Sequence, residues 1–304
     1  MNKFVLRQSF LLLLTAVIWG VAFVAQSVGM DYVEPFTFIA VRNVIGVLVL
    51  LPCIGLLNRL NAKASPDQPE KSGPDQKSRK VLITGGICCG ICLFTASALQ
   101  QFGVKYTTVG KAGFITAMYM VLVPVFGIFL HRKTSVKVWI AVALAAIGMY
   151  FLCITKGEFG LQLGDLLVFA CAVCFTFHIL VIDHFSPMTD GVKLSCIQFA
   201  TCAVLGSIFM LIFEHPNIEN ILAAWVPILY AGAMSSGVAY TLQIIGQKGM
   251  NPTVASLILS LESVVSVLAG WLILHQKLSG RELFGCALAF CAIILVQLPD
   301  KKKS

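Results

Sequence analysis

Apolar runs of about 20 residues succeed one another along nearly the whole chain, and they limit its fold more than any other feature. A helix rises about 1.5 Å per residue, so about 20 apolar residues are needed to cross roughly 30 Å of hydrocarbon. In lipid the backbone must satisfy its own hydrogen bonds, and a helix does so within one segment. We therefore expect an all-α membrane protein. The ten expected transmembrane helices cover residues 8–28, 35–57, 81–102, 109–130, 135–155, 162–182, 192–213, 225–247, 252–274 and 281–298.

The charges of this chain lie between the runs rather than within them. Charged residues make up 12% of the 304 positions, whereas soluble domains carry about 25%. The net charge of +8 could suit nucleic acid, but most Lys and Arg residues fall in the loops on the side of the N-terminus. That distribution is the positive-inside bias, so we expect both termini in the cytoplasm and no nucleic-acid partner. The first run is too long for the core of a signal peptide, and we interpret it as a span.

A short phrase occurs twice in the chain. Leu99-Gln100-x-x-Gly103-x-Lys105 returns 143 residues later as Leu242-Gln243-x-x-Gly246-x-Lys248. Downstream, Leu130-His131-x-Lys133-x-Ser135 returns as Leu274-His275-x-Lys277-x-Ser279. Duplication within a membrane-embedded chain is typical of transporters built from two repeats around a central site.

The first two spans align with spans six and seven at a larger offset of 156, which pairs Trp19 with Phe175 and Arg42 with Gln198. The change in offset is explained by a linker over residues 61–80, which is rich in Pro, Ser, Lys and Asp and which we expect to be disordered. We divide the chain into a first repeat, 1–156, and a second repeat, 157–304. Each repeat has five spans, and an odd number requires the two copies to cross the membrane in opposite directions, as inverted repeats.

Three ionisable side chains fall inside the expected spans. Each costs roughly 2.5–3.5 kcal/mol to insert, so each requires a partner or a function. Glu262 lies near the midplane and could carry a proton or bind a substrate ammonium group. Arg42 lies at a similar depth, and a fixed Glu262–Arg42 pair is the structural alternative. Lys111 could attract a carboxylate or phosphate, or extend its amine to the interface.

Several uncharged side chains in the spans could also contact a substrate. Trp19 and Tyr119 could stack on it, although packing between helices is the alternative. His178 could relay protons or be a buried neutral histidine. Gln100 and Gln243 hold matching positions in the repeated phrase, which favours a symmetric scaffold role. The expected substrate-binding residues are Glu262, Lys111, Arg42, Trp19, Tyr119, Gln198 and Tyr240.

No motif in the sequence indicates catalysis or a cofactor. The chain lacks HExxH, G-x-S-x-G and a phosphate-binding loop of the G-x-x-x-x-G-K type. Of the 11 cysteines, Cys89 and Cys92 have a spacing found among metal ligands, but we interpret them as small apolar residues of a membrane helix. We therefore expect no catalytic residues, no metal, no cofactor and no enzymatic activity.

The order of several short segments resembles the EamA-type, ten-helix members of the drug/metabolite transporter superfamily. The similarity covers about residues 8–298. At three positions the chain departs from many members, with Ser263 in place of Pro and with His131 and His275 in place of Glu. The segments that carry the resemblance are Trp19-Gly20, Pro35 to Arg42, Thr107 to Phe114 leading into Tyr119 and Pro124, and Asn251 to Ser256 leading into Glu262.

This resemblance implies a secondary transporter that exports small metabolites or amino acids by alternating access between inverted repeats. An intramembrane lipid-modifying enzyme and a sugar-phosphate or nucleotide-sugar exchanger are the alternatives. The expected partners are a small-molecule substrate and the lipid bilayer, with coupling to protons and a homodimer left open. The expected location is the cell (plasma) membrane, as a multi-pass protein.

Overall fold

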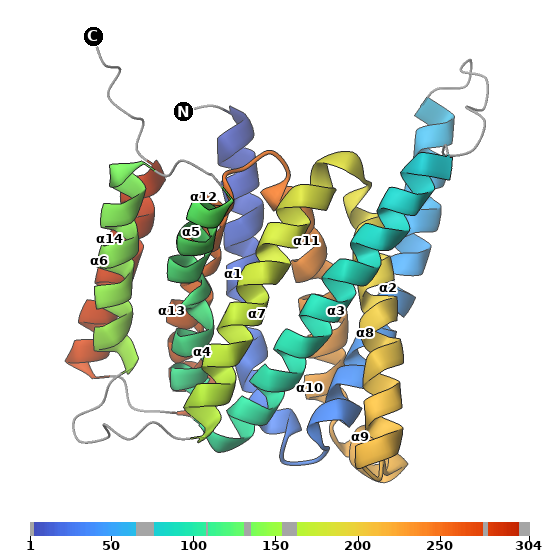
Figure 1. Cartoon of the computed structure of the whole chain (residues 1–304). Helices are drawn as coiled ribbons and strands as arrows, with labels where there is room; N and C mark the ends of the chain where they lie inside the picture. The colour runs from blue at the N-terminus through green and yellow to red at the C-terminus, as the bar shows by residue number, and fades with distance from the viewer. Residues whose placement is uncertain are drawn as a thin grey trace.

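The computed structural model describes residues 3–64, 76–107, 109–130, 135–153, 163–275 and 279–297, and within these ranges it is helical with no strand (Figure 1). The first half contains α1 (Lys3–Gly29), α2 (Pro35–Ala64), α3 (Gln76–Tyr106), α4 (Val109–Ala117), α5 (Tyr119–Phe129) and α6 (Val136–Cys153). The second half contains α7 (Leu163–Phe185), η1 (Ser186–Met188), α8 (Gly191–Phe213), α9 (Ile218–Ala223), α10 (Trp225–Leu229), η2 (Tyr230–Tyr240), α11 (Thr241–Gln247), α12 (Pro252–Leu259), α13 (Leu261–Leu274) and α14 (Gly280–Gln297).

Eight helical segments of the described residues are long and apolar enough to cross a membrane. They correspond to eight of the ten expected spans, which confirms an all-helical, multi-pass membrane protein. The other two expected spans, 135–155 and 281–298, correspond to the helices α6 and α14. The count of ten transmembrane helices stays a prediction.

Successive long helices run in opposite directions through one bundle (Figure 1). One end of the bundle is where α1, α3 and α8 begin and where α2, α7 and α11 end. Arg7, Arg59, Lys77, Lys193 and Lys248 lie near this end, which we call the basic end. The other end is called the opposite end.

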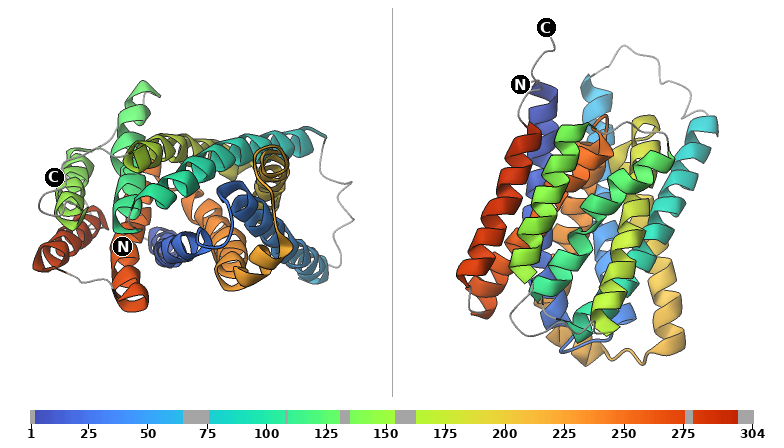
Figure 2. Two further views of the ribbon diagram at one scale, coloured as in Figure 1. Left: turned by 90° about the horizontal axis from the view of Figure 1, so that it is seen from below. Right: turned by 60° about the vertical axis from the view of Figure 1, so that its left-hand side comes forward.

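Packing places α1 inside the bundle and the α6–α14 pair at one side of it (Figure 2). The helix α1 contacts α13, α11, α12 and η2, whereas α3 packs along α7 and α8. Close approach depends on glycine, because a Cβ on Gly20 of α1 would lie 2.8 Å from the carbonyl oxygen of Glu262 in α13. The central helices therefore meet near Glu262.

Local sequence signals fix where several helices begin. Asn251 caps α12 by accepting a hydrogen bond from the Thr253 N–H at 2.9 Å, and Pro252 occupies the first helical position. Asp190 caps α8 in the same way, with bonds of 3.0 Å from the N–H groups of Val192 and Lys193. These caps satisfy backbone donors that would otherwise lack a partner.

The expected linker over residues 61–80 is wrong at both edges. The helix α2 continues to Ala64 and α3 begins at Gln76, so both helices extend into the predicted linker. Residues 65–75 lie outside the described residues, as does the expected boundary between the two repeats at 156–157.

Candidate functional site

In two of the apolar segments the helix is interrupted, at corresponding positions of the two halves of the chain. The segment 109–130 breaks at Met118, between α4 and α5, and the segment 252–274 breaks at Ser260, between α12 and α13. Pro124 lies inside α5, and the break at Met118 precedes it by six residues. Tyr119 begins the helix after the first break, and Glu262 lies in the first turn after the second.

Serine hydroxyls accompany the break in the second segment. Ser256, Ser260, Ser263 and Ser266 each donate to the backbone carbonyl three residues earlier, over 2.7–2.9 Å. Such bonds compete with the helical ladder and bend helices. These four serines thus form hydrogen bonds within the segment on both sides of Glu262.

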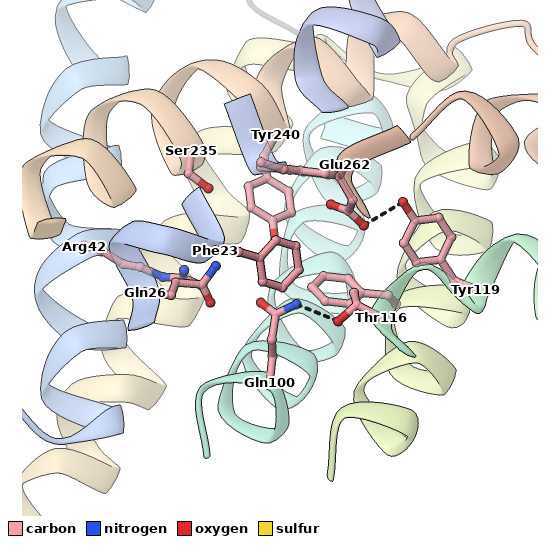
Figure 3. A pocket seen from close by; sticks show the side chains of 11 residues that line it. Phe23, Gln26, Arg42, Gln100, Thr116, Tyr119, Ser235, Tyr240 and Glu262 are labelled. Atoms are coloured by element: carbon pink, nitrogen blue, oxygen red, sulfur yellow. Dashed lines mark hydrogen bonds between the residues drawn. The ribbon is translucent and has the colours of Figure 1, made fainter. Parts of the chain in front are cut away.

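Tyr119 and Glu262 contact each other across the centre of the bundle. The Tyr119 hydroxyl donates to Glu262 Oε1 at 2.8 Å, and the two side chains are 2% and 3% exposed (Figure 3). Their positions differ by 143, which is the offset of the repeated phrase. The bond therefore joins the two segments, 109–130 and 252–274, that the sequence duplication pairs.

A small cavity surrounds this hydrogen bond. Its volume is about 20 Å³, which is room for about one water molecule. Along α1 the lining residues Trp19, Phe23 and Gln26 follow one another toward the opposite end. The complete lining is Trp19, Phe23, Gln26, Arg42, Gln100, Thr116, Tyr119, Phe175, Ser235, Tyr240 and Glu262 (Figure 3).

Arg42 lines the same cavity without pairing with Glu262. Its Nη2 donates to Ser97 Oγ at 2.9 Å, and the guanidinium carbon lies 5.9 Å from the centre of the Phe38 ring. Its Nε has no partner within the described protein. The fixed Glu262–Arg42 pair that the sequence left open does not form in this structure. Glu262 and Arg42 instead face the same cavity without bonding to each other, and Arg42 retains an N–H group that could donate a further hydrogen bond.

Aromatic side chains form one wall of the cavity. The Trp19 and Tyr240 rings lie 4.5 Å apart between centroids, and Trp19 Nε1 has no hydrogen-bond partner among the described residues. Tyr240 ends η2, a π-helical segment of 11 residues. Such segments are rare and occur frequently at functional sites. The wider turn brings Ser235, five residues before Tyr240, to the same cavity.

Several lining residues were not expected from the sequence. Phe23, Gln26, Thr116 and Ser235 were not expected there, although Gln26 follows Trp19 at helical spacing and Thr116 precedes Tyr119 by three residues. The repeat alignment held a signal for Phe175, because it pairs this residue with Trp19.

Of the expected site residues whose side chains the structure describes, Gln198 is the one that does not line the cavity. Gln198 lies away from it, and its Oε1 is 3.0 Å from His178 Nε2. Lys111 belongs to α4, but its side chain is outside the part of the chain that the structure describes. Within the described part, no group of three His, Cys, Asp or Glu side chains could hold a metal ion.

Comparison with known proteins identifies the family. The EamA-like transporter family matches residues 6–154 and 162–298. An uncharacterized transporter of Archaeoglobus fulgidus is 30% identical over 288 residues, which are 94% of this chain and 84% of that protein. The uncharacterized transporter YoaV of Bacillus subtilis is 22% identical over 293 residues, covering 91% of this chain and 92% of that protein.

A solved crystal structure shares the fold, with a TM-score of 0.74 at 20% identity, over 95% of this chain and 96% of that chain. The family match covers most of the chain, and the helices described above are those of a multi-pass membrane protein. The chain therefore belongs to the EamA-like transporter family.

Proposed function

We propose that this protein is a secondary transporter that exports small metabolites or amino acids by alternating access between two inverted five-helix repeats. The observation that carries the proposal is the central cavity, where Tyr119 and Glu262 meet at 2.8 Å from matching helix breaks. Secondary transporters place their substrate sites between repeats, at discontinuous helices near the middle of the membrane.

The directions of the helices support inverted repeats. The helices α1 and α7 occupy matching places in the two halves, and they cross the bundle in opposite directions (Figure 1). The family matches each half of the chain separately, over 6–154 and 162–298. Two repeats that cross the membrane in opposite directions around one cavity are an arrangement that recurs in transporters with alternating access.

The chemistry of the cavity favours a substrate that carries both an amine and an acid. Glu262 can accept hydrogen bonds from an ammonium group, and Arg42 and Trp19 have free N–H donors for a carboxylate. Because Glu262 and Arg42 are not paired with each other, a zwitterion could satisfy both charges at once. The aromatic wall of Trp19, Tyr240 and Phe175 could hold the apolar part of such a molecule.

The small size of the cavity supports a mechanism in which the helices move to admit the substrate. A volume of about 20 Å³ holds one water molecule and no amino acid, so substrate binding requires the helices to separate. The breaks at Met118 and Ser260 divide two of the central segments into shorter helices that could tilt independently. We propose these breaks as hinges.

The decisive experiment replaces Glu262 by Gln, which keeps the size of the side chain and removes its charge. We expect export to fall by at least about a hundredfold, with unchanged insertion into the membrane. Metabolites in cells and medium would be compared by untargeted mass spectrometry with and without overexpression, and the best candidate measured in liposomes. Glu219→Gln, at an exposed acid in α9, is the matched control and should keep full activity.

Unchanged flux in the Glu262 variant would remove this carboxylate from the mechanism. Exchange of a phosphorylated sugar across liposomes, with no net export, would favour the exchanger instead. A change in covalent structure of a lipid would favour the enzyme. A pH-sensitive dye inside the liposomes reports whether protons accompany the substrate.

We place the basic end in the cytoplasm and the protein in the plasma membrane. The basic residues near that end support this orientation through the positive-inside bias.

A further inference from the structure

We propose that the transport path leaves the cavity toward the basic end between α7, α8 and α11, along a line of buried polar side chains that water reaches when this end opens. The inference rests on the proposed function and assigns residues outside the cavity to it. We call this line the polar seam. It consists of His178 and Ser186 from α7 and η1, Ser195 and Gln198 from α8, and Gln243 and Gln247 from α11.

The seam combines deep burial with missing hydrogen bonds. Each of the six side chains is at most 1% exposed. His178 and Gln198 bond to each other, yet His178 Nδ1 and Gln198 Nε2 have no partner in the described protein. The same is true of Ser186 Oγ, Ser195 Oγ, Gln243 Oε1 and both polar atoms of the Gln247 amide.

Unsatisfied polar atoms are expensive in a protein interior and rare in native structures, so this concentration requires an explanation. Interior polar side chains of membrane proteins that face neither lipid nor a partner mark the pathways of substrates and ions. Water entering the seam would give each of these atoms a partner. In the conformation described here, which is closed at this end, the polar atoms of the seam therefore have fewer hydrogen bonds than they would have after water enters.

The seam begins at the cavity. Tyr240 lines the cavity and its ring lies 5.9 Å from the His178 ring, centroid to centroid. Gln243 and Gln247 follow Tyr240 at helical spacing toward the basic end, where α11 stops. Ser195 lies one turn closer to that end than Gln198, near the start of α8. The polar atoms therefore extend from the cavity to the basic end.

An apolar cluster closes the seam about one turn from the basic end. It consists of Ile182, Leu194 and Ile244, one from each of the three helices, together with Cys89 of α3, and all four are fully buried. We call this cluster the plug. Gln8 of α1 holds the end of α11 in place, because its Nε2 donates to the carbonyl oxygens of Ile245 and Lys248 at 2.8 and 3.0 Å.

Helix α11 is suited to move away from α7 and α8. It has seven residues and follows the π-helical segment η2, whose backbone can return to α-helical pairing by a shift of one residue. Displacement of α11 would part Ile244 from Ile182 and Leu194. The cost of exposing this plug is offset in part by the hydration of the polar seam.

A reversible cross-link tests whether the plug must open. In a Cys89→Ala background, Leu194→Cys and Ile244→Cys are combined and the protein is placed in liposomes. Oxidation should join α8 to α11 and reduce flux at least about tenfold, and a thiol reductant should restore it. The matched controls are the two variants that carry only one of these cysteines. Their flux should be the same before and after oxidation.

A labelling experiment tests the water route independently of transport. Gln243→Cys would be exposed to a charged, membrane-impermeant thiosulfonate added from the basic end of oriented membrane vesicles, and the modified peptide would be quantified by mass spectrometry. We expect labelling at least about fivefold above that of Val204→Cys, whose side chain on α8 is 59% exposed on the outside of the bundle. The cross-linked plug should suppress the labelling of Gln243→Cys.

The outcomes separate this inference from the proposed function. Flux that survives the cross-link, together with a Gln243→Cys that does not react, would overturn the path through the seam while leaving the transporter intact. Reagent entry that the cross-link blocks, in a protein that moves none of the metabolites tested, would support the water route and overturn the proposed function.

Discussion

Gln100 and Gln243 hold matching positions in the repeated phrase, yet they have different surroundings. Gln100 Nε2 donates to Thr116 Oγ1 at 3.1 Å on the wall of the cavity. Gln243 Oε1 lies in the polar seam without a partner in the described protein. The sequence favoured one symmetric scaffold role for both residues, and the structure contradicts that symmetry. The same residue type at matching positions can therefore form a stabilising hydrogen bond in one repeat and lack that bond in the other.

The two ends of the bundle show the same contrast. At the opposite end the Glu214 carboxylate, just after α8, accepts bonds of 2.7 Å from the N–H groups of Phe36 and Thr37 and from the Thr37 hydroxyl. It thereby caps α2 and joins it to α8. Within the part of the chain that the structure describes, the polar seam near the basic end has no comparable set of partners. Because separating satisfied groups costs more than separating unsatisfied ones, we expect the basic end to open more readily.

The largest expected effect comes from removing the contact at the opposite end. Glu214→Ala leaves three donors of α2 without this acceptor, and we expect the free energy of unfolding to fall by about 3 kcal/mol. Thermal or detergent-induced unfolding of the purified protein measures the change. Glu219→Ala, at the exposed acid of α9, is the control and should change stability by less than about 0.5 kcal/mol. Equal stability of the two variants would contradict the role of Glu214.

The two glutamines give a smaller and more direct test. Gln100→Leu removes its bond to Thr116 and should lower the free energy of unfolding by about 1 kcal/mol. Gln243→Leu removes an amide oxygen that has no partner among the residues the structure describes, so it should be neutral or stabilising. The same unfolding assay compares them. Similar losses in both variants would restore the symmetric scaffold role.

The smallest effect is expected at Ser195. Its hydroxyl has no partner among the described residues, so Ser195→Ala should raise the free energy of unfolding by about 0.5 kcal/mol or leave it unchanged. The same change should slow flux, because the seam becomes less polar. Ser97→Ala is the matched control, because that hydroxyl accepts from Arg42 and its loss should cost about 1.5 kcal/mol. A clear loss of stability in Ser195→Ala would indicate a bond that holds the seam closed.

Much of the cavity could be predicted because polar side chains are conspicuous in apolar runs. Five expected residues, Trp19, Arg42, Tyr119, Tyr240 and Glu262, line it. Phe23 does so as well, but a phenylalanine in an apolar run has no feature that separates lining from packing, and only the repeat alignment with Trp19 distinguishes Phe175. Ser235 depends on the π-helical turn, which shifts side chains relative to α-helical spacing.

The sequence by itself determined which segments are helices, because helix formation in lipid is local and depends on apolar length, internal hydrogen bonds and caps such as Asn251. It also indicated the family, through motifs that survive in order along the chain. Only the tertiary structure decided that Glu262 bonds to Tyr119 and not to Arg42, and that Gln243 lacks the partner that Gln100 has. Such pairing depends on how each helix is rotated, where it breaks and which neighbour it packs against, and the sequence of one helix does not contain that information.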